Sequence, residues 1–188
     1  MKNISILISG SGTNLQRIID CIANREIRNA KINLVIADRE CYGLEIAEKH
    51  QIPNRLIKKG KDFSENLEKV IPENTDLIVL AGFLSILKSA FFESWKGKII
   101  NIHPALLPKF GGKGMWGMNV HNSVIEAGER ESGATVHFVT SEIDKGEIIL
   151  QGRVEIAENE TAETLAQKVH KIEYKIFPKA IDWVLNEL

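Results

Sequence analysis

Cysteine is scarce in this sequence: among 188 residues there are only Cys21 and Cys41. The two thiols lie far apart in the chain and show no Cys-x-x-Cys spacing. The sequence therefore indicates neither a disulfide scaffold nor a zinc site. Two unassociated cysteines are typical of a reducing compartment, and we expect a cytoplasmic protein.

Long apolar runs and an excess of one charge are also lacking. No apolar stretch approaches the length of a membrane span, and the first one, residues 4–8, is too short for the core of a signal peptide. Lysine and arginine number 24 against 25 aspartates and glutamates, so the chain has no general attraction to nucleic acid or to a membrane surface. We expect small-molecule substrates, with no nucleic acid and no membrane among the partners, and either a monomer or a homodimer.

The first hundred residues alternate short apolar runs with helical patterns. Runs rich in Ile, Val and Leu predict strands at residues 4–8, 32–37, 54–57, 77–81 and 99–102. Between them, helices are predicted at residues 14–23, 43–50, 65–71 and 84–92, with Ser64 as the cap of the third. Strands that are apolar on both faces and separated by helices indicate a parallel sheet.

The pattern changes after residue 130. Residues 134–140 and 148–156 predict two antiparallel strands joined by a turn, and Thr161 begins a long terminal helix that Pro178 is expected to kink or interrupt. The predicted fold class is α/β: a Rossmann-like, mostly parallel sheet flanked by helices, with an antiparallel C-terminal strand pair and a long kinked terminal helix. We expect one domain over residues 1–188, with a substrate-binding half (1–100) and a catalytic half (101–188).

The most informative segment is Asn-Ile-His-Pro-Ala-Leu-Leu-Pro, residues 101–108, which follows a predicted strand. Asn101 and His103 are two residues apart, so on an extended backbone their side chains share a face. Pro104 ends the strand because it has no N–H to donate. An amide that can stabilise an oxyanion, beside an imidazole that can transfer a proton, indicates acyl chemistry.

A second motif, Ser-Gly-Ser-Gly-Thr-Asn-Leu at residues 9–15, lies between the first strand and the first helix. Glycines allow close approach of a ligand, and the free N–H groups of a helix start favour an anion such as phosphate. The dinucleotide pattern Gly-x-Gly-x-x-Gly fails because Leu15 occupies the third glycine position, although Asp38 follows the second strand as a ribose-binding acid would. A single phosphate on a sugar or nucleotide fits the motif better.

Together with Leu-Ala-Gly-Phe-Leu (80–84), Gly-Ala-Thr-Val-His-Phe-Val (133–139) and Asp144, these motifs resemble the folate-dependent phosphoribosylglycinamide formyltransferases of purine synthesis. The resemblance covers essentially the whole chain. It implies transfer of a formyl group from 10-formyltetrahydrofolate, as co-substrate, to the amine of phosphoribosylglycinamide, with no metal.

The resemblance also assigns site residues. It implies catalytic roles for Asn101, His103 and Asp144. The expected contacts to the phosphoribosyl substrate are Gly12, Thr13, Asn14, Phe83, His170 and Glu173. The expected contacts to the folate are Leu84, Ser85, Ile86, Leu87, Asn101, Thr140, Ser141, Glu142, Ile143 and Asp144. His170 and Glu173 are three residues apart on the predicted helix and so share a face.

The chain departs from the family pattern around the substrates. Ser85 occupies a position where some relatives have an arginine beside the folate, and a further arginine expected before Glu65 is missing, with Lys58, Lys59 and Lys61 as candidate replacements for its charge. Residues 109–117 form a glycine-rich loop. Its Lys113 either reaches the folate tail or is solvated, and its Trp116 either covers the pterin or contacts a second subunit.

The remaining histidines receive different interpretations. His50 is expected to end a surface helix, and His137, in an alternating strand, is interpreted as structural. His121 is placed in the variable loop, with either role open.

Three other functions are compatible with parts of this pattern. A methionyl-tRNA formyltransferase carries a further basic domain, which is not expected in a chain that ends at Leu188 with balanced charges. A formyltetrahydrofolate hydrolase usually has an N-terminal regulatory domain, whereas here the first strand begins at residue 4. A non-enzymatic nucleotide- or folate-binding module is compatible with the fold alone, but the combination of Asn101, His103 and Asp144 argues against it.

Overall fold

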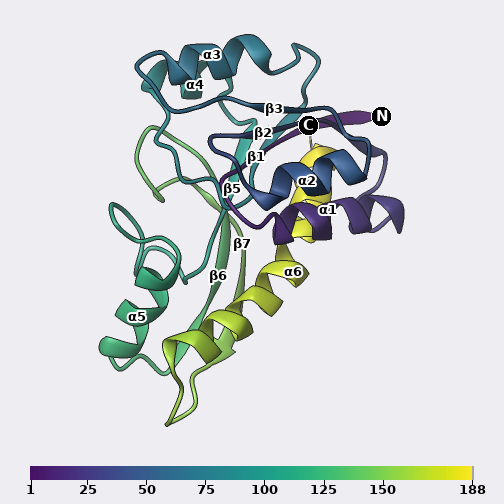
Figure 1. Ribbon diagram of the computed structural model, residues 1–188. Coiled ribbons are helices and arrows are strands. Elements are labelled where there is room, and N and C mark those ends of the chain that lie inside the picture. The colour runs from purple at the N-terminus through teal and green to yellow at the C-terminus, as the bar shows by residue number, and fades with distance from the viewer. Residues whose placement is uncertain (188) are drawn as a thin grey trace.

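A seven-stranded sheet organises the chain, as Figure 1 shows for the computed structural model, which describes residues 1–187. The strand order is β3-β2-β1-β4-β5-β6-β7. The strands are β1 (Lys2–Ile8), β2 (Ala30–Ala37), β3 (Asn54–Leu56), β4 (Leu77–Leu80), β5 (Ile99–His103), β6 (Glu131–Phe138) and β7 (Ile148–Glu155). Strands β1 to β5 pair in parallel, and β6 and β7 pair antiparallel. The predicted α/β fold class is confirmed.

Helices cover both faces of the sheet (Figure 1). They are α1 (Thr13–Ala23), α2 (Tyr42–Lys49), α3 (Phe63–Val70), α4 (Ser89–Ser94), α5 (Met118–Glu126) and α6 (Ala162–Glu187). Apolar residues of α1 and α6 pack on one face of the sheet, and those of α3 and α4 pack on the other. Because the parallel strands are buried on both faces, their sequences read as continuous apolar runs. No helix within residues 1–187 is long and apolar enough to cross a membrane.

Helix α6 runs through Pro178 without interruption. A proline inside a helix has no N–H for the carbonyl four residues earlier, which here belongs to Tyr174. The side chain of Arg17 replaces that donor: its Nε lies 3.2 Å from the Tyr174 carbonyl oxygen. At the other end, the Thr161 hydroxyl accepts a hydrogen bond from the Thr164 N–H, which confirms Thr161 as the residue that begins the helix.

Two local predictions are wrong around α3 and α4. The helix expected over 84–92 begins only at Ser89, because Gly82 leaves β4 with a φ of +73° and the Leu84 N–H donates to the Ser9 hydroxyl instead of a helical carbonyl. Ser64 does not cap α3 but lies inside it, and its hydroxyl accepts the Lys88 N–H at 3.0 Å. These two side-chain acceptors hold the ends of residues 84–88, which have no regular secondary structure.

Helix α5 is not anticipated by the sequence analysis. His121, expected in a loop, lies on this helix and is 6% exposed. Val120 and Val124 are buried on the same helix at a spacing of four, a helical signal that the preceding glycines obscure.

Candidate active site

The antiparallel register of β5 and β6 positions the two central polar side chains. Asn101 pairs with His137 and His103 pairs with Thr135 across the two strands. Strand β5 ends at His103, directly before Pro104, so both side chains lie at the carboxyl edge of the parallel strands. Ligands of open α/β sheets bind at this edge.

Asp144 reaches the same place from the loop between β6 and β7. Its Oδ2 lies 3.6 Å from His103 Nδ1, and its Oδ1 lies 3.7 Å from His137 Nε2. His103 Nε2 donates to the Phe110 carbonyl oxygen at 2.8 Å, which leaves Nδ1 facing the carboxylate. The structure thus brings an amide, an imidazole and a carboxylate from distant parts of the chain into one cluster.

His137 orients the amide of Asn101. Its Nδ1 lies 2.8 Å from the Phe138 carbonyl oxygen, so Nδ1 carries the proton and donates. Burial lowers the pKa of His137, which keeps the ring neutral with a free lone pair on Nε2. That lone pair accepts from Asn101 Nδ2 at 3.2 Å, which fixes the rotamer of the amide. The structural role expected for His137 is therefore a positioning role within the cluster.

The backbone around Asp144 is specialised. Asp144 has a φ of +55°, an uncommon conformation for a residue other than glycine. Its Oδ2 accepts the Gly112 N–H at 2.9 Å. A Cβ at Gly111 would lie 2.6 Å from Leu107 Cδ2 and 3.2 Å from Asp144 Cβ, so the glycine-rich loop packs tightly against the acid. Part of that loop therefore positions Asp144.

The glycine turn has the close packing that its sequence predicts. Gly12 is left-handed with a φ of +72°, and a Cβ there would lie 2.6 Å from Gly43 Cα. Thr13 begins α1, and the Asn14 side chain donates to Glu173 Oε2 at 3.1 Å. The Asn14 Oδ1 atom is buried and has no hydrogen-bond partner among residues 1–187, which leaves an acceptor available to a ligand.

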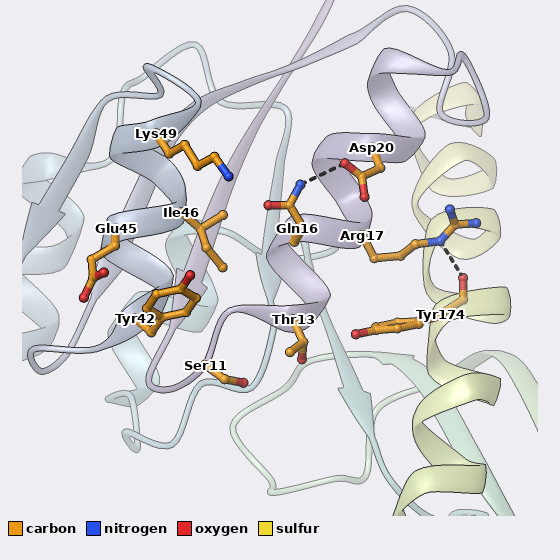
Figure 2. Close-up of a pocket in the computed structure, with 10 residues that line it drawn as sticks. All are labelled: Ser11, Thr13, Gln16, Arg17, Asp20, Tyr42, Glu45, Ile46, Lys49 and Tyr174. Atoms are coloured by element: carbon orange, nitrogen blue, oxygen red, sulfur yellow. Dashed lines mark hydrogen bonds between the residues drawn. The ribbon is translucent and has the colours of Figure 1, made fainter.

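His170 joins this second cluster from α6. Its Nδ1 lies 2.9 Å from Glu173 Oε2, as their spacing predicts, and its Nε2 lies 2.8 Å from the Tyr174 hydroxyl. Tyr174 is absent from the sequence-based set of site residues, although its spacing of four from His170 was a signal for it. An open groove of about 660 Å³ adjoins the glycine turn. Figure 2 shows Ser11 and Thr13 beside it, and the Tyr174 ring on its α6 side.

Apart from Asn101 on β5, the residues assigned to the folate lie on two segments. Residues 84–87 follow β4: Leu84 and Ile86 are exposed, Leu87 is buried, and the Phe83 ring stacks on Phe63 with centroids 6.2 Å apart. Residues 140–144 belong to the β6–β7 loop, where Ile143 and Asp144 line a hollow of about 350 Å³ together with the glycine-rich loop. Exposed apolar side chains beside a polar cluster suit a flat, partly apolar ligand.

His121 lies between the two clusters. Burial lowers its pKa, while the charge of Glu173 acts to raise it and that of His103 to lower it. Its Nδ1 atom is buried and has no hydrogen-bond partner in the described part of the chain. Within residues 1–187 no group of three or more His, Cys, Asp or Glu side chains is arranged to hold a metal ion.

An amide, an imidazole and a carboxylate at the carboxyl edge of an α/β sheet define a group-transfer site. Comparison with known protein families agrees with this assignment. Residues 2–181 match the formyl transferase family, and the chain belongs to that family. It is 44% identical to the phosphoribosylglycinamide formyltransferase of Haemophilus influenzae over 97% of this chain and 87% of that protein. It is also 40% identical to the human trifunctional purine biosynthetic protein adenosine-3, of which it spans only 18%.

Solved structures show the same similarity. The phosphoribosylglycinamide formyltransferase of Anaplasma phagocytophilum superposes with a TM-score of 0.89 at 35% identity, covering 99% of this chain and 88% of that one. The phosphoribosylglycinamide formyltransferase of Coxiella burnetii superposes with a TM-score of 0.87 at 41% identity. The match covers 97% of this chain and 86% of that one. The family expected from the sequence motifs is confirmed.

Proposed function

We propose that this protein transfers the formyl group of 10-formyltetrahydrofolate to the amine of phosphoribosylglycinamide, in purine biosynthesis. The observation that carries the proposal is the convergence of Asn101 and His103 on β5 with Asp144, 3.6 Å from the His103 ring. The relatives that the chain matches over nearly its whole length bear the name of this activity.

The proposed chemistry begins with attack of the neutral substrate amine on the formyl carbon. A C–N bond forms, and the carbonyl oxygen becomes an oxyanion in a tetrahedral intermediate. Asn101 Nδ2 keeps one N–H that His137 does not engage, and this N–H is the proposed donor for that oxyanion. Both ring nitrogens of His103 already face the Phe110 carbonyl and Asp144, so His103 contributes a nearby positive charge when it is protonated. Preorganised donors of this kind are worth about 10²–10³ in rate each.

Collapse of the intermediate breaks its bond to the folate nitrogen. The attacking amine loses a proton and the folate nitrogen gains one, so no net proton is released. His103 and Asp144 are the proposed proton-transfer groups, because they are adjacent and face each other. The products are formyl-phosphoribosylglycinamide and tetrahydrofolate.

The two substrates have separate proposed sites. The ribonucleotide phosphate binds at the backbone N–H groups of Gly12, Thr13 and Asn14, at the start of α1, where a helix favours an anion. Glu173, His170 and Phe83 complete that side. The folate lies along residues 84–87 and 140–144, where its formyl group reaches Asn101. The two-part division of the chain, the monomer or dimer and the cytoplasmic location stay predictions.

The test compares acceptors. Purified protein is given 10-formyltetrahydrofolate with either phosphoribosylglycinamide or water as acceptor, and both products are quantified. We expect turnover only with the glycinamide substrate. Deformylation in its absence would instead indicate a hydrolase, and no turnover with either acceptor would favour a binding module.

A substitution separates the two proposed sites. Glu173→Gln keeps the size of the side chain but removes the charge that Asn14 and His170 contact. We expect the KM for the ribonucleotide to rise about tenfold or more, since a charge-assisted hydrogen bond is lost, while the KM for the folate stays unchanged. Equal changes in both constants would contradict the assignment of Glu173.

A further inference from the structure

Helix α6 has a gap in its hydrogen bonding beside the residues proposed to bind the ribonucleotide. Pro178 has no N–H, so the Tyr174 carbonyl cannot receive the usual hydrogen bond from four residues later in its own helix. Arg17 on α1 supplies a donor instead, with its Nε 3.2 Å from the Tyr174 carbonyl oxygen. Figure 2 shows this side chain reaching from α1 to α6. The gap in one helix is therefore closed by another.

The same two helices also meet at the residue before Tyr174. Asn14 lies three residues before Arg17, on the same face of α1, and its Nδ2 donates to Glu173 Oε2 at 3.1 Å. Two neighbouring residues of α6, Glu173 and Tyr174, are thus each held by a residue of α1. Asn14 and Glu173 belong to the proposed ribonucleotide site, and Arg17 supports that site from one turn further along α1.

Glu26 orients the guanidinium for this contact. Its Oε2 accepts from Arg17 Nη2 at 2.8 Å, which leaves Nε directed at α6. The Arg17 side chain is 31% exposed and that of Glu26 is 47% exposed, and an ion pair with this exposure contributes little to stability. The partly buried bond to the Tyr174 carbonyl matters more, because a backbone acceptor that loses its donor away from water is costly.

We propose that Arg17 is a positioning residue, which keeps the ribonucleotide site assembled by holding α6 against the start of α1; this inference rests on the proposed function. Without the guanidinium, the Tyr174 carbonyl turns toward water, and the part of α6 that carries Glu173 moves away from Asn14. The ribonucleotide then binds only the fraction of molecules in which Asn14 and Glu173 stay in contact. Its apparent dissociation constant rises by the inverse of that fraction.

The test measures the dissociation constants of phosphoribosylglycinamide and tetrahydrofolate by calorimetry, together with kcat for formyl transfer. In Arg17→Gln we expect the dissociation constant of the ribonucleotide to rise about five- to tenfold, as for the loss of one hydrogen bond. The dissociation constant of the folate should stay unchanged, because residues 84–87 and 140–144 lie outside α1 and α6. At saturating substrates kcat should also stay unchanged, because the bound ribonucleotide itself holds the site together.

A substitution at Pro178 separates an effect through the carbonyl from any other effect of Arg17. Pro178→Ala returns an N–H to position 178, so the Tyr174 carbonyl regains a donor from its own helix. In the Pro178→Ala background, Arg17→Gln should change the ribonucleotide dissociation constant by less than about twofold. Glu26→Gln is the matched control, because it removes the ion pair of Arg17 but leaves the carbonyl contact in place. This control should bind both ligands as the wild type does.

The inference is overturned if Arg17→Gln binds the ribonucleotide as the wild type does, or weakens its binding equally with and without Pro178→Ala. A lower Tm with unchanged ribonucleotide affinity would also overturn it, because that result assigns Arg17 to stability alone. Arg17→Met, which keeps the apolar stem without a donor, is measured beside Arg17→Gln and should give the same result. Failure of the proposed function is seen separately, as a wild-type protein that binds both ligands but transfers no formyl group.

Discussion

Replacing Gly12 by alanine perturbs the glycine turn at its tightest point. The new Cβ would lie 2.6 Å from Gly43 Cα, whereas ordinary van der Waals contact begins at 3.4 Å. Since Gly43 Cα belongs to the backbone, the start of α1 and Gly43 must separate by about 0.8 Å. The left-handed φ of +72° adds a penalty of about 1–2 kcal/mol for any residue with a Cβ.

The expected loss of stability and the expected rise in KM determine which quantities are measured. Overpacking costs about 1–3 kcal/mol, so the free energy of unfolding should fall by about 2–5 kcal/mol in total. A domain of this size has about 5–15 kcal/mol of stability, so the variant stays folded unless the wild type lies at the bottom of that range, and Tm falls by about 4–20 °C. A displacement near 1 Å at a binding site costs up to about 100-fold, so we expect the KM for phosphoribosylglycinamide to rise by about that factor.

The assay is steady-state formyl transfer at varied ribonucleotide, with Tm recorded for each variant. Gly10→Ala is the matched control, because a Cβ there meets nothing within 4 Å and its φ is not left-handed. Gly10→Ala should keep the wild-type Tm, and we expect its KM to change little. A Gly12→Ala protein with an unchanged KM would refute the placement of the phosphate at this turn.

Three further predictions concern single side chains. Asp144→Asn keeps the shape of the side chain but removes its charge, so the turnover rate should fall by a factor of about 10²–10⁴ while Tm is unchanged. An unchanged turnover rate would show that Asp144 has no part in the mechanism. Burial raises the pKa of Cys21 to about 11, so iodoacetamide at pH 8 should modify half-buried Cys41 and spare Cys21 in the folded protein, as mass spectrometry would show. The lowered pKa of His137 predicts a neutral ring with its proton on Nδ1 at pH 7, which nitrogen NMR would show. The stability that this ring contributes is present above its unfolded pKa near 6.5 and is lost as the pH falls from there through the lower folded pKa. An Nε2–H tautomer would contradict the orientation of Asn101.

Sequence periodicity predicts the sheet well because its strands are apolar on both faces. The predicted strands over 4–8 and 99–102 lie within β1 and β5. Helix α5 escaped prediction because four glycines precede it, and residues 84–88 were wrongly assigned to a helix because their backbone groups bond to Ser9 and Ser64 from distant elements. Such side-chain acceptors leave no local signal in the sequence.

The candidate site also contains some contacts that the sequence predicts and others that it does not. The spacing of Asn101 and His103 predicts a shared face, and β5 places them there. The position of Asp144 came from the family resemblance, since its approach to His103 depends on a loop more than forty residues away. The contact from His137 to the Asn101 amide depends on the β5–β6 register, which no periodicity reveals.

The most direct test of the proposed chemistry is a single-turnover experiment with 10-formyltetrahydrofolate labelled in its formyl carbon. Enzyme in excess is mixed with labelled folate and phosphoribosylglycinamide, and the label is followed in the ribonucleotide and in formate. We predict that wild-type protein places the label in the ribonucleotide, and that folded His103→Ala does so at least about 100-fold more slowly. Label released as formate by the wild type, or an unchanged rate in His103→Ala, would contradict the account.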